Sequence, residues 1–181
     1  MPQETVISSN QYREQAHQAF ADADMAKALS LLGKASQEDP NNFFVHLDLA
    51  RMYFQTGNIE KAQNLIHKLP DEAKESEEGQ FLLSLFKYTQ VIADVGDIET
   101  IQNRLAKDEN DSEALYGLSA YLMLNGQVEQ AIQTLLKLFT TNREFQEGVA
   151  QKSLIDIFNL HQSQQPQLIS TYRRKLQGLL F

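Results

Sequence analysis

A pattern of small and apolar residues recurs every 34 positions along this chain, and no other feature of the sequence constrains the fold as strongly. In a frame that starts at Ser9, the residues Ala16, Ala28 and Leu32 occupy positions 8, 20 and 24. Frames that start at Phe43 and Ser112 repeat the pattern, with Leu49, Ala50, Tyr53, Gly57, Ala62 and Ile66 in one and Leu115, Leu118, Gly126, Ala131 and Leu135 in the other. Alanines at fixed places in such a unit predict closely packed elements that stack one after another.

Each repeat contains two stretches with the apolar spacing of a helix, separated by a turn. Residues 42–55 show this spacing, and the pair Gly57 and Asn58 that follows tolerates the left-handed backbone with which many helices end. The helical period resumes over residues 59–69 and stops at Pro70. The unit is therefore a helix–turn–helix.

This arrangement resembles the tetratricopeptide repeat (TPR), in which two antiparallel helices touch through small residues. It predicts an all-α fold, a TPR-like helical-hairpin solenoid of about four repeats plus two C-terminal capping helices. The third repeat is irregular: its first helix is expected to continue to about Val95, and its second, Ile98–Lys107, is short. The expected divisions are a disordered lead at 1–8, repeats at 9–145 and a helical cap at 146–181.

The composition indicates which kinds of partner and which cellular compartment to expect. The chain of 181 residues has a net charge of −8, which argues against nucleic acid as a partner because phosphates attract basic surfaces. No apolar run approaches the roughly 20 residues that span a bilayer, and residues 1–10 show no export signal. Cysteine is absent, which excludes disulfides and fits a reducing compartment. We therefore expect a cytoplasmic protein that binds neither membranes nor nucleic acid.

The sequence shows no catalytic or metal-binding motif. The four histidines lack the spacing of a metal site and are expected at the surface or its boundary; they are His17, His46, His67 and His161. Acidic residues cluster at 71–78 and 108–113 without the spacing of a calcium loop, so they are expected to lie in solvated turns between repeats. We expect a non-catalytic protein with no cofactor and no metal.

In a TPR stack, the first helix of each repeat lines the concave face. In the first repeat this resemblance implies that Arg13 and His17 lie on that face. Later repeats carry aromatic and aliphatic side chains and one arginine there, and these are candidate partner-binding residues: Phe44, Leu47, Arg51, Phe54, Phe81, Leu85, Tyr88 and Tyr116. An exposed apolar strip usually marks a protein-binding site. The alternative is that the frame is one residue off, or that the C-terminal helices fold over the groove and make these side chains core.

A clamp for the C-terminal carboxylates of chaperones is not expected on this face. TPR proteins of that type use Lys, Asn and Arg in the concave helices, whereas this chain has Asp48, Glu78 and Leu82 at the matching places. The groove would therefore recognise apolar groups.

The last helical stretch, opened by Pro166, combines a basic cluster with an apolar stripe. We expect Leu168, Tyr172 and Leu176 to pack on the preceding helix. The side chains expected to remain available to a partner are Arg173, Arg174, Leu179, Leu180 and Phe181. The alternative is that the whole helix only caps the solenoid.

The C-terminal part of the chain resembles the YbbN family, also called CnoX or chaperedoxin. The resemblance is carried by 149–158 (VAQKSLIDIF), by 171–176 (TYRRKL) and by the chain end at 179–181 (LLF). The stretch 131–136 (AIQTLL) is similar to the last TPR hairpin of that family. The resemblance covers residues 9–181.

Members of the YbbN family join a thioredoxin-fold domain to a TPR region and act as bacterial cytoplasmic chaperones that hold unfolding clients and associate with the chaperonin. This sequence lacks the thioredoxin domain and any redox motif, so we expect it to be an excised C-terminal region without redox activity. The resemblance implies that unfolded clients, and the chaperonin, bind through the TPR surface and the helix Gln167–Phe181. A second hypothesis is a static scaffold that holds one folded partner in a multiprotein complex.

Overall fold

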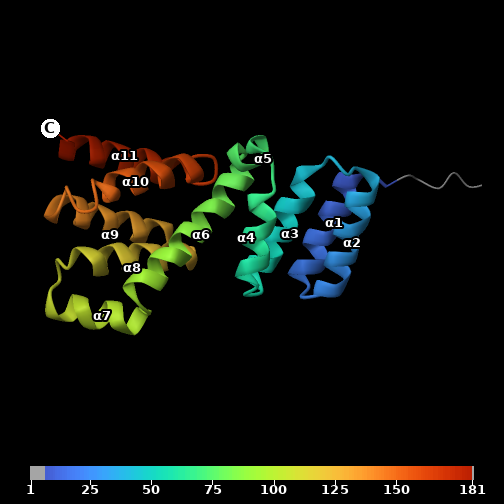
Figure 1. Ribbon diagram of the computed structural model, residues 1–181. Helices are drawn as coiled ribbons and strands as arrows, with labels where there is room; N and C mark the ends of the chain where they lie inside the picture. The colour runs from blue at the N-terminus through green and yellow to red at the C-terminus, as the bar shows by residue number, and fades with distance from the viewer. Residues whose placement is uncertain (1–6, 181) are drawn as a thin grey trace, which may run out of the picture. The chain divides into compact units, whose positions relative to one another are not determined.

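The computed structural model describes residues 7–180, and their regular structure is entirely α-helical (Figure 1). These residues form eleven helices: α1 (Ser9–Ala21), α2 (Met25–Glu38), α3 (Phe43–Gln55), α4 (Ile59–His67), α5 (Asp71–Glu75), α6 (Glu77–Val95), α7 (Ile98–Lys107), α8 (Ser112–Leu124), α9 (Val128–Thr141), α10 (Val149–His161) and α11 (Pro166–Leu180). The chain divides into two compact units, Met1–Leu83 and Ser84–Phe181, and the boundary falls within α6. Most of the lead predicted at 1–8 lies outside the described residues, while Ser8 caps α1.

The first unit is built from two helical hairpins. α1 packs on α2, α3 packs on α4, and α3 also contacts both helices of the first hairpin. Ala16 and Ala28 are fully buried between these helices, because a methyl side chain lets two helix axes approach closely. Leu32 and Val45 fill the same core. The alanines that define the repeat are thus packing positions.

The turn inside a hairpin has the same hydrogen bonds in three of the repeats. In the second repeat, Gly57 adopts a φ of 78° and the amide of Asn58 donates to the carbonyl of Tyr53 at 2.8 Å. This six-to-one bond is the mark of a Schellman motif, which satisfies carbonyls at the end of a helix. Gly126 repeats the conformation with a φ of 71°, and in the first repeat Ala23 adopts it with a φ of 61°. A left-handed alanine is costly, because its Cβ meets the following carbonyl.

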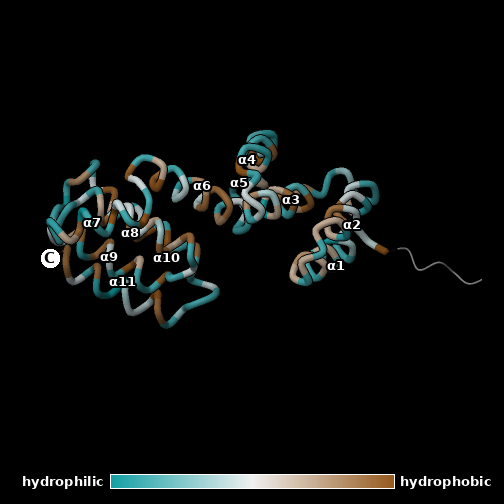
Figure 2. Tube along the Cα trace, turned by 90° about the horizontal axis from the view of Figure 1, so that it is seen from below, coloured by the Kyte–Doolittle hydropathy of each residue, from teal (hydrophilic) through white to brown (hydrophobic). Residues whose placement is uncertain are grey.

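The second unit continues the hairpin pattern with α8 and α9, and α10 and α11 both pack on α9. α7 packs on α8, where Gly117 lies so close that a Cβ there would be 2.8 Å from Val95 Cγ1 and 3.1 Å from Ile101 Cδ1. The core is continuous and includes side chains from α8, α9, α10 and α11, such as Phe139 and Phe158. Figure 2 shows the corresponding alternation of hydrophobic and hydrophilic residues along these helices.

The irregular third repeat has the helices expected for it. α6 ends at Val95 and α7 spans Ile98–Lys107. The acidic segment after Pro70 was expected to be a turn, and that expectation is wrong for Asp71–Glu75, which forms the short helix α5. Its acidic residues favour a helical first turn because they interact with the positive end of the helix dipole.

Helix starts in both units use aspartate caps. Asp24, Asp97 and Asp111 each accept a hydrogen bond from the amide three residues later, at 2.8–3.0 Å. The guanidinium of Arg104 on α7 also donates to both carboxylate oxygens of Asp111, at 2.8 and 2.9 Å, and to Glu113. These hydrogen bonds, with that from the Ala114 amide, lower the pKa of the Asp111 carboxyl. The cap of α8 thereby also links α7 to α8.

Candidate protein-binding surface

A buried carboxylate organises the surface formed by α1 and α3. Asp48 on α3 is 8% exposed, and Arg13 Nε on α1 donates to its Oδ2 at 2.6 Å. His17 Nε2 lies 2.8 Å from the other oxygen, Oδ1. A buried carboxylate is tolerated when it is paired and hydrogen-bonded, as here. The contact fixes the side chains of two successive repeats relative to one another.

Aromatic rings and guanidinium groups adjoin this ion-pair cluster. The guanidinium carbon of Arg13 lies 4.9 Å from the centre of the half-buried Phe44 ring, and the rings of Phe43 and Phe44 are 4.4 Å apart. On the same helix, the exposed Arg51 lies 5.8 Å from the ring centre of Phe81 on α6. These spacings suit cation–π attraction.

We name Arg13, His17, Phe44, Asp48, Arg51 and Phe81 the α1/α3 face. Aromatic residues and arginine are enriched in protein–protein interfaces, where they supply most of the binding energy. Phe54, a further candidate on α3, is half-buried. Sequence reasoning located Arg13 and His17 but treated Asp48 only as evidence against a carboxylate clamp. It missed that the carboxylate of Asp48 on α3 pairs with Arg13 and His17, which occupy positions 5 and 9 of the preceding repeat.

Three of the candidate residues belong to the interior, so the expectation that they line an open groove is wrong. Leu47 is 3% exposed, Tyr88 7% and Tyr116 8%. Leu47 follows Phe44 by three residues, which rotates it about 60° around α3 at 100° per residue. Tyr88 and Tyr116 belong to the core of the second unit, where Phe145 packs edge-on against Tyr116.

In the second unit, α10 contributes side chains to the core that buries Tyr88 and Tyr116, and it forms an ion pair with α6. Lys87 Nζ on α6 lies 3.1 Å from Asp156 Oδ2 on α10. The neighbouring Tyr88 has its pKa raised, first by burial and then by the charge of Asp156. Leu85, one turn earlier on α6, is half-buried.

The apolar side of the terminal helix is buried, and the helix contacts α9 as well as the preceding helix α10. Tyr172 and Leu176 are buried in the core, and Leu168 packs partly buried against it. Tyr172 also donates from its hydroxyl to Glu129 Oε1 at 2.9 Å and accepts from Gln133 Nε2 at 2.7 Å. These bonds tie α11 to α9.

The basic residues of the terminal helix differ in their availability. Arg173 was expected to remain available to a partner; it is half-buried, and its guanidinium donates to Asn159 Oδ1 at 3.0 Å and lies 5.4 Å from the Phe158 ring centre. Arg174 is exposed. The carbonyl of the partly buried Leu179 accepts from Arg143 Nη2 at 2.6 Å, while Leu180 is 40% exposed. Phe181 lies outside the described residues.

One histidine also departs from expectation. His161, at the end of α10, is 6% exposed, and neither ring nitrogen has a hydrogen-bond partner. Burial lowers the pKa of its imidazole, because the charged form loses its hydration. His161 is thus a core side chain in which burial favours the neutral form of the imidazole.

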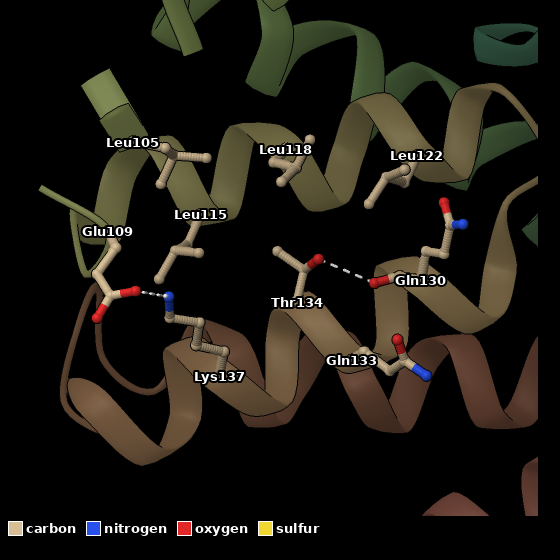
Figure 3. Close-up of a pocket in the computed structure, with 9 residues that line it drawn as sticks. All are labelled: Leu105, Glu109, Leu115, Leu118, Leu122, Gln130, Gln133, Thr134 and Lys137. Atoms are coloured by element: carbon tan, nitrogen blue, oxygen red, sulfur yellow. Dashed lines mark hydrogen bonds and ion pairs between the residues drawn. The ribbon is translucent and has the colours of Figure 1, made fainter. Parts of the chain in front are cut away.

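An open groove of about 480 Å³ lies between α8 and α9 in the second unit (Figure 3). Its apolar side is formed by Leu115, Leu118 and Leu122, and the facing side by polar residues of α9. The only ion pair across its rim, among the residues drawn in Figure 3, joins Lys137 Nζ to Glu109 Oε2 at 3.4 Å.

Within residues 7–180, no group of three or more His, Asp or Glu side chains is arranged to hold a metal ion. In the same part of the chain, no helix combines the length and the apolar character needed to cross a membrane.

Comparison with known families decides the class of the protein. Two models described as tetratricopeptide repeat match the chain, one over residues 19–85 and the other over residues 91–181. The chain belongs to the tetratricopeptide repeat family. The predicted fold class, an all-α TPR hairpin array, is confirmed, and TPR regions are protein-interaction modules that use their helical surfaces for binding.

No curated protein matches the chain. Among solved structures, that of a mutant of MamA is similar, at 15% sequence identity and a TM-score of 0.41, over 93% of this chain and 96% of that one.

Proposed function

We propose that this TPR protein is the client-binding region of a chaperone resembling the YbbN family, and that it holds unfolding proteins through the α1/α3 face. The observation that supports this most is the juxtaposition of Phe44 and Phe81 with Arg13 and Arg51. Aromatic rings beside guanidinium groups contact apolar and acidic segments of many sequences.

The same proposal assigns chaperonin binding to the exposed residues of α11. Arg174 and Leu180 are exposed at the end of this helix, within the motif that resembles the YbbN terminus. The compartment that fits this role is the bacterial cytoplasm. A redox step has no place in the proposal, because the chain has no cysteine.

A static scaffold is the second candidate, and the ion-pair cluster favours it. Arg13 and His17 fix Asp48 in one geometry, so this part of the face is preorganised. Preorganised surfaces suit one folded partner, because less conformational entropy is lost on binding.

The two candidates differ in the number of proteins that they recognise. A holdase should suppress the heat-induced aggregation of several unrelated proteins, for example citrate synthase, malate dehydrogenase and luciferase, measured by light scattering. A scaffold should suppress none of them and should recover one stoichiometric partner from bacterial lysate. Suppression of no client would contradict the chaperone proposal.

Two charge-reversal variants test the α1/α3 face and the α11 surface separately. Arg51→Glu changes an exposed residue on α3, and Arg174→Glu makes the same change on α11. We expect Arg51→Glu to weaken client protection and Arg174→Glu to weaken chaperonin co-purification, each without the other effect. Circular dichroism and melting would confirm that both variants are folded.

A further inference from the structure

The first unit has a groove on α3 and α4 that is separate from the α1/α3 face. It consists of two adjoining hollows of about 410 and 300 Å³, which share Leu65 and Lys68 as lining residues. Phe43, Leu49, Tyr53 and Leu69 supply most of the remaining apolar lining, and Lys61 and His46 also line the hollows. We name these residues the α3/α4 groove. Within the described chain, no carboxylate lines either hollow.

The groove in Figure 3 occupies the same positions of the fourth repeat, and the two differ in charge. His46, Leu49, Tyr53, Lys61, Asn64, Leu65 and Lys68 correspond in the 34-residue frame to Leu115, Leu118, Leu122, Gln130, Gln133, Thr134 and Lys137. Lys61 is thus replaced by the neutral Gln130, and Lys137 is already paired with Glu109. A shared backbone therefore carries a cationic groove in the first unit and a largely neutral one in the second.

The lysines of the α3/α4 groove continue a pattern from the first hairpin. Lys27 and Lys34 on α2 occupy the same repeat positions as Lys61 and Lys68 on α4, and all four are exposed. Because equivalent positions of stacked hairpins face the same way, these lysines share one side of the unit. None of the four forms an ion pair with a residue in 7–180.

This cationic side belongs to an acidic unit. Residues 1–83 contain seven Lys or Arg and thirteen Asp or Glu. Four lysines that contact tyrosine rings at most, and no carboxylate within the described residues, are therefore a local reversal of the overall charge. A long polyanion would meet repulsion from the rest of the unit, whereas a short acidic segment can lie within the reversed patch. The apolar lining also needs a side chain to cover it, and nucleic-acid backbones supply none.

We propose that the α3/α4 groove binds an acidic peptide segment of a partner protein, with an apolar side chain in the hollow and carboxylates at Lys61 and Lys68. The two lysines are seven residues apart on one helix, so their Cα atoms are separated by about 10.5 Å at 1.5 Å per residue. An extended peptide covers that distance in about three residues at roughly 3.4 Å each. The recognised segment therefore has two acidic residues about three positions apart with an apolar residue between them.

Selection from a library of random 12-residue peptides displayed on phage tests the site without a known partner. The complete 181-residue chain serves as bait. We expect the recovered peptides to be enriched in Asp or Glu at this spacing around an apolar residue. The absence of enriched peptides, or enriched peptides without acidic residues, would overturn the proposal.

Fluorescence polarisation of a labelled selected peptide then locates the site. The double variant Lys61→Glu/Lys68→Glu should weaken binding at least tenfold, and the milder Lys61→Gln/Lys68→Gln should weaken it less. The control Lys107→Glu/Lys152→Glu makes the same change at two exposed lysines of the second unit and should bind as the parent does. Equal binding by the parent and both groove variants would refute the site.

Two further probes distinguish other polyanions. A 20-nucleotide single-stranded DNA and vesicles that contain phosphatidylserine are titrated in the same assay. If either binds more tightly than the peptide and loses binding in the Lys61→Glu/Lys68→Glu variant, the peptide assignment is wrong. Arg51 does not line the α3/α4 groove, so Arg51→Glu should leave peptide binding unchanged while client protection falls. This result would show that the groove proposal and the proposed function can fail separately.

Discussion

Ala23 is the alanine in a turn position that two other repeats fill with glycine, and we predict that Ala23→Gly stabilises the protein. Its φ of 61° lies in the left-handed region, as do those of Gly57 and Gly126. The amide of Asp24 donates to the carbonyl of Ala19 at 2.8 Å, as in the glycine turns, so the backbone conformation is required by the motif.

The magnitude is the difference between two opposing effects. A non-glycine residue costs about 1–2 kcal/mol in the left-handed conformation, and glycine removes that cost. Glycine also gives the unfolded chain more freedom, which destabilises the folded state by about 0.4–1 kcal/mol. The net gain in the free energy of unfolding is about 0.5–1 kcal/mol.

Urea unfolding followed by circular dichroism measures this gain, and the reverse change at Gly57 is its matched control. A Cβ at Gly57 would meet no atom within 4 Å, so Gly57→Ala reports only the backbone cost. We expect Gly57→Ala to lower the free energy of unfolding by about as much as Ala23→Gly raises it. If Ala23→Gly destabilises while Gly57→Ala is neutral, the argument from the turn is refuted.

Three further predictions concern the second unit and the first hairpin. Gly117→Ala should lower the free energy of unfolding by about 1–2 kcal/mol, because its Cβ would clash with side chains of α6 and α7. Gly33→Ala has open space around it and should raise the free energy of unfolding by about 0.5–1 kcal/mol. Urea unfolding tests both. The lowered pKa of buried His161 means that the unfolded state binds more protons, so stability should fall as the pH decreases below about 6.5; His161→Leu should remove part of this fall in thermal melts at pH 5 and 7. Asp111→Asn keeps a capping oxygen but loses the charge paired with Arg104. Near neutral pH it should therefore lower the free energy of unfolding by about 0.5–1 kcal/mol less than Asp111→Ala does. The loss caused by Asp111→Asn should become smaller in acid, where the carboxyl of the parent protein is protonated. Equal urea midpoints for the two Asp111 variants would contradict the last prediction.

The hairpin array could be predicted from sequence because its determinants are local or periodic. The buried alanines, such as Ala16 and Ala28, mark where helices touch, and Gly57 and Gly126 mark the turns. The end of α6 and the start of α7 followed from Gly96, which adopts a φ of 117° where the chain leaves one helix for the next. These signals are independent of tertiary contacts between distant elements.

The exposure of the candidate binding residues could not be predicted in the same way. A repeat position specifies the face of a helix on which a side chain lies, but it does not specify what covers that face. Tyr88 and Tyr116 occupy concave positions, yet they are buried in a core to which α10 contributes. The apolar spacing of α10 indicated a buried face without indicating its partner, and the burial of His161 was invisible for the same reason.

The two units show how one repeat geometry yields surfaces of different chemistry. In the second unit, core packing uses the aromatic residues at concave positions, and the groove of Figure 3 has an apolar side opposite neutral amides. In the first unit, Phe44 and Arg51 are not fully buried, and Lys61 and Lys68 line the equivalent groove. Binding energy is concentrated where aromatic and cationic side chains remain accessible. Apart from the chaperonin contacts proposed for α11, substitutions that alter partner recognition should therefore cluster in residues 9–83, whereas equivalent substitutions in α8–α10 should act mainly on stability.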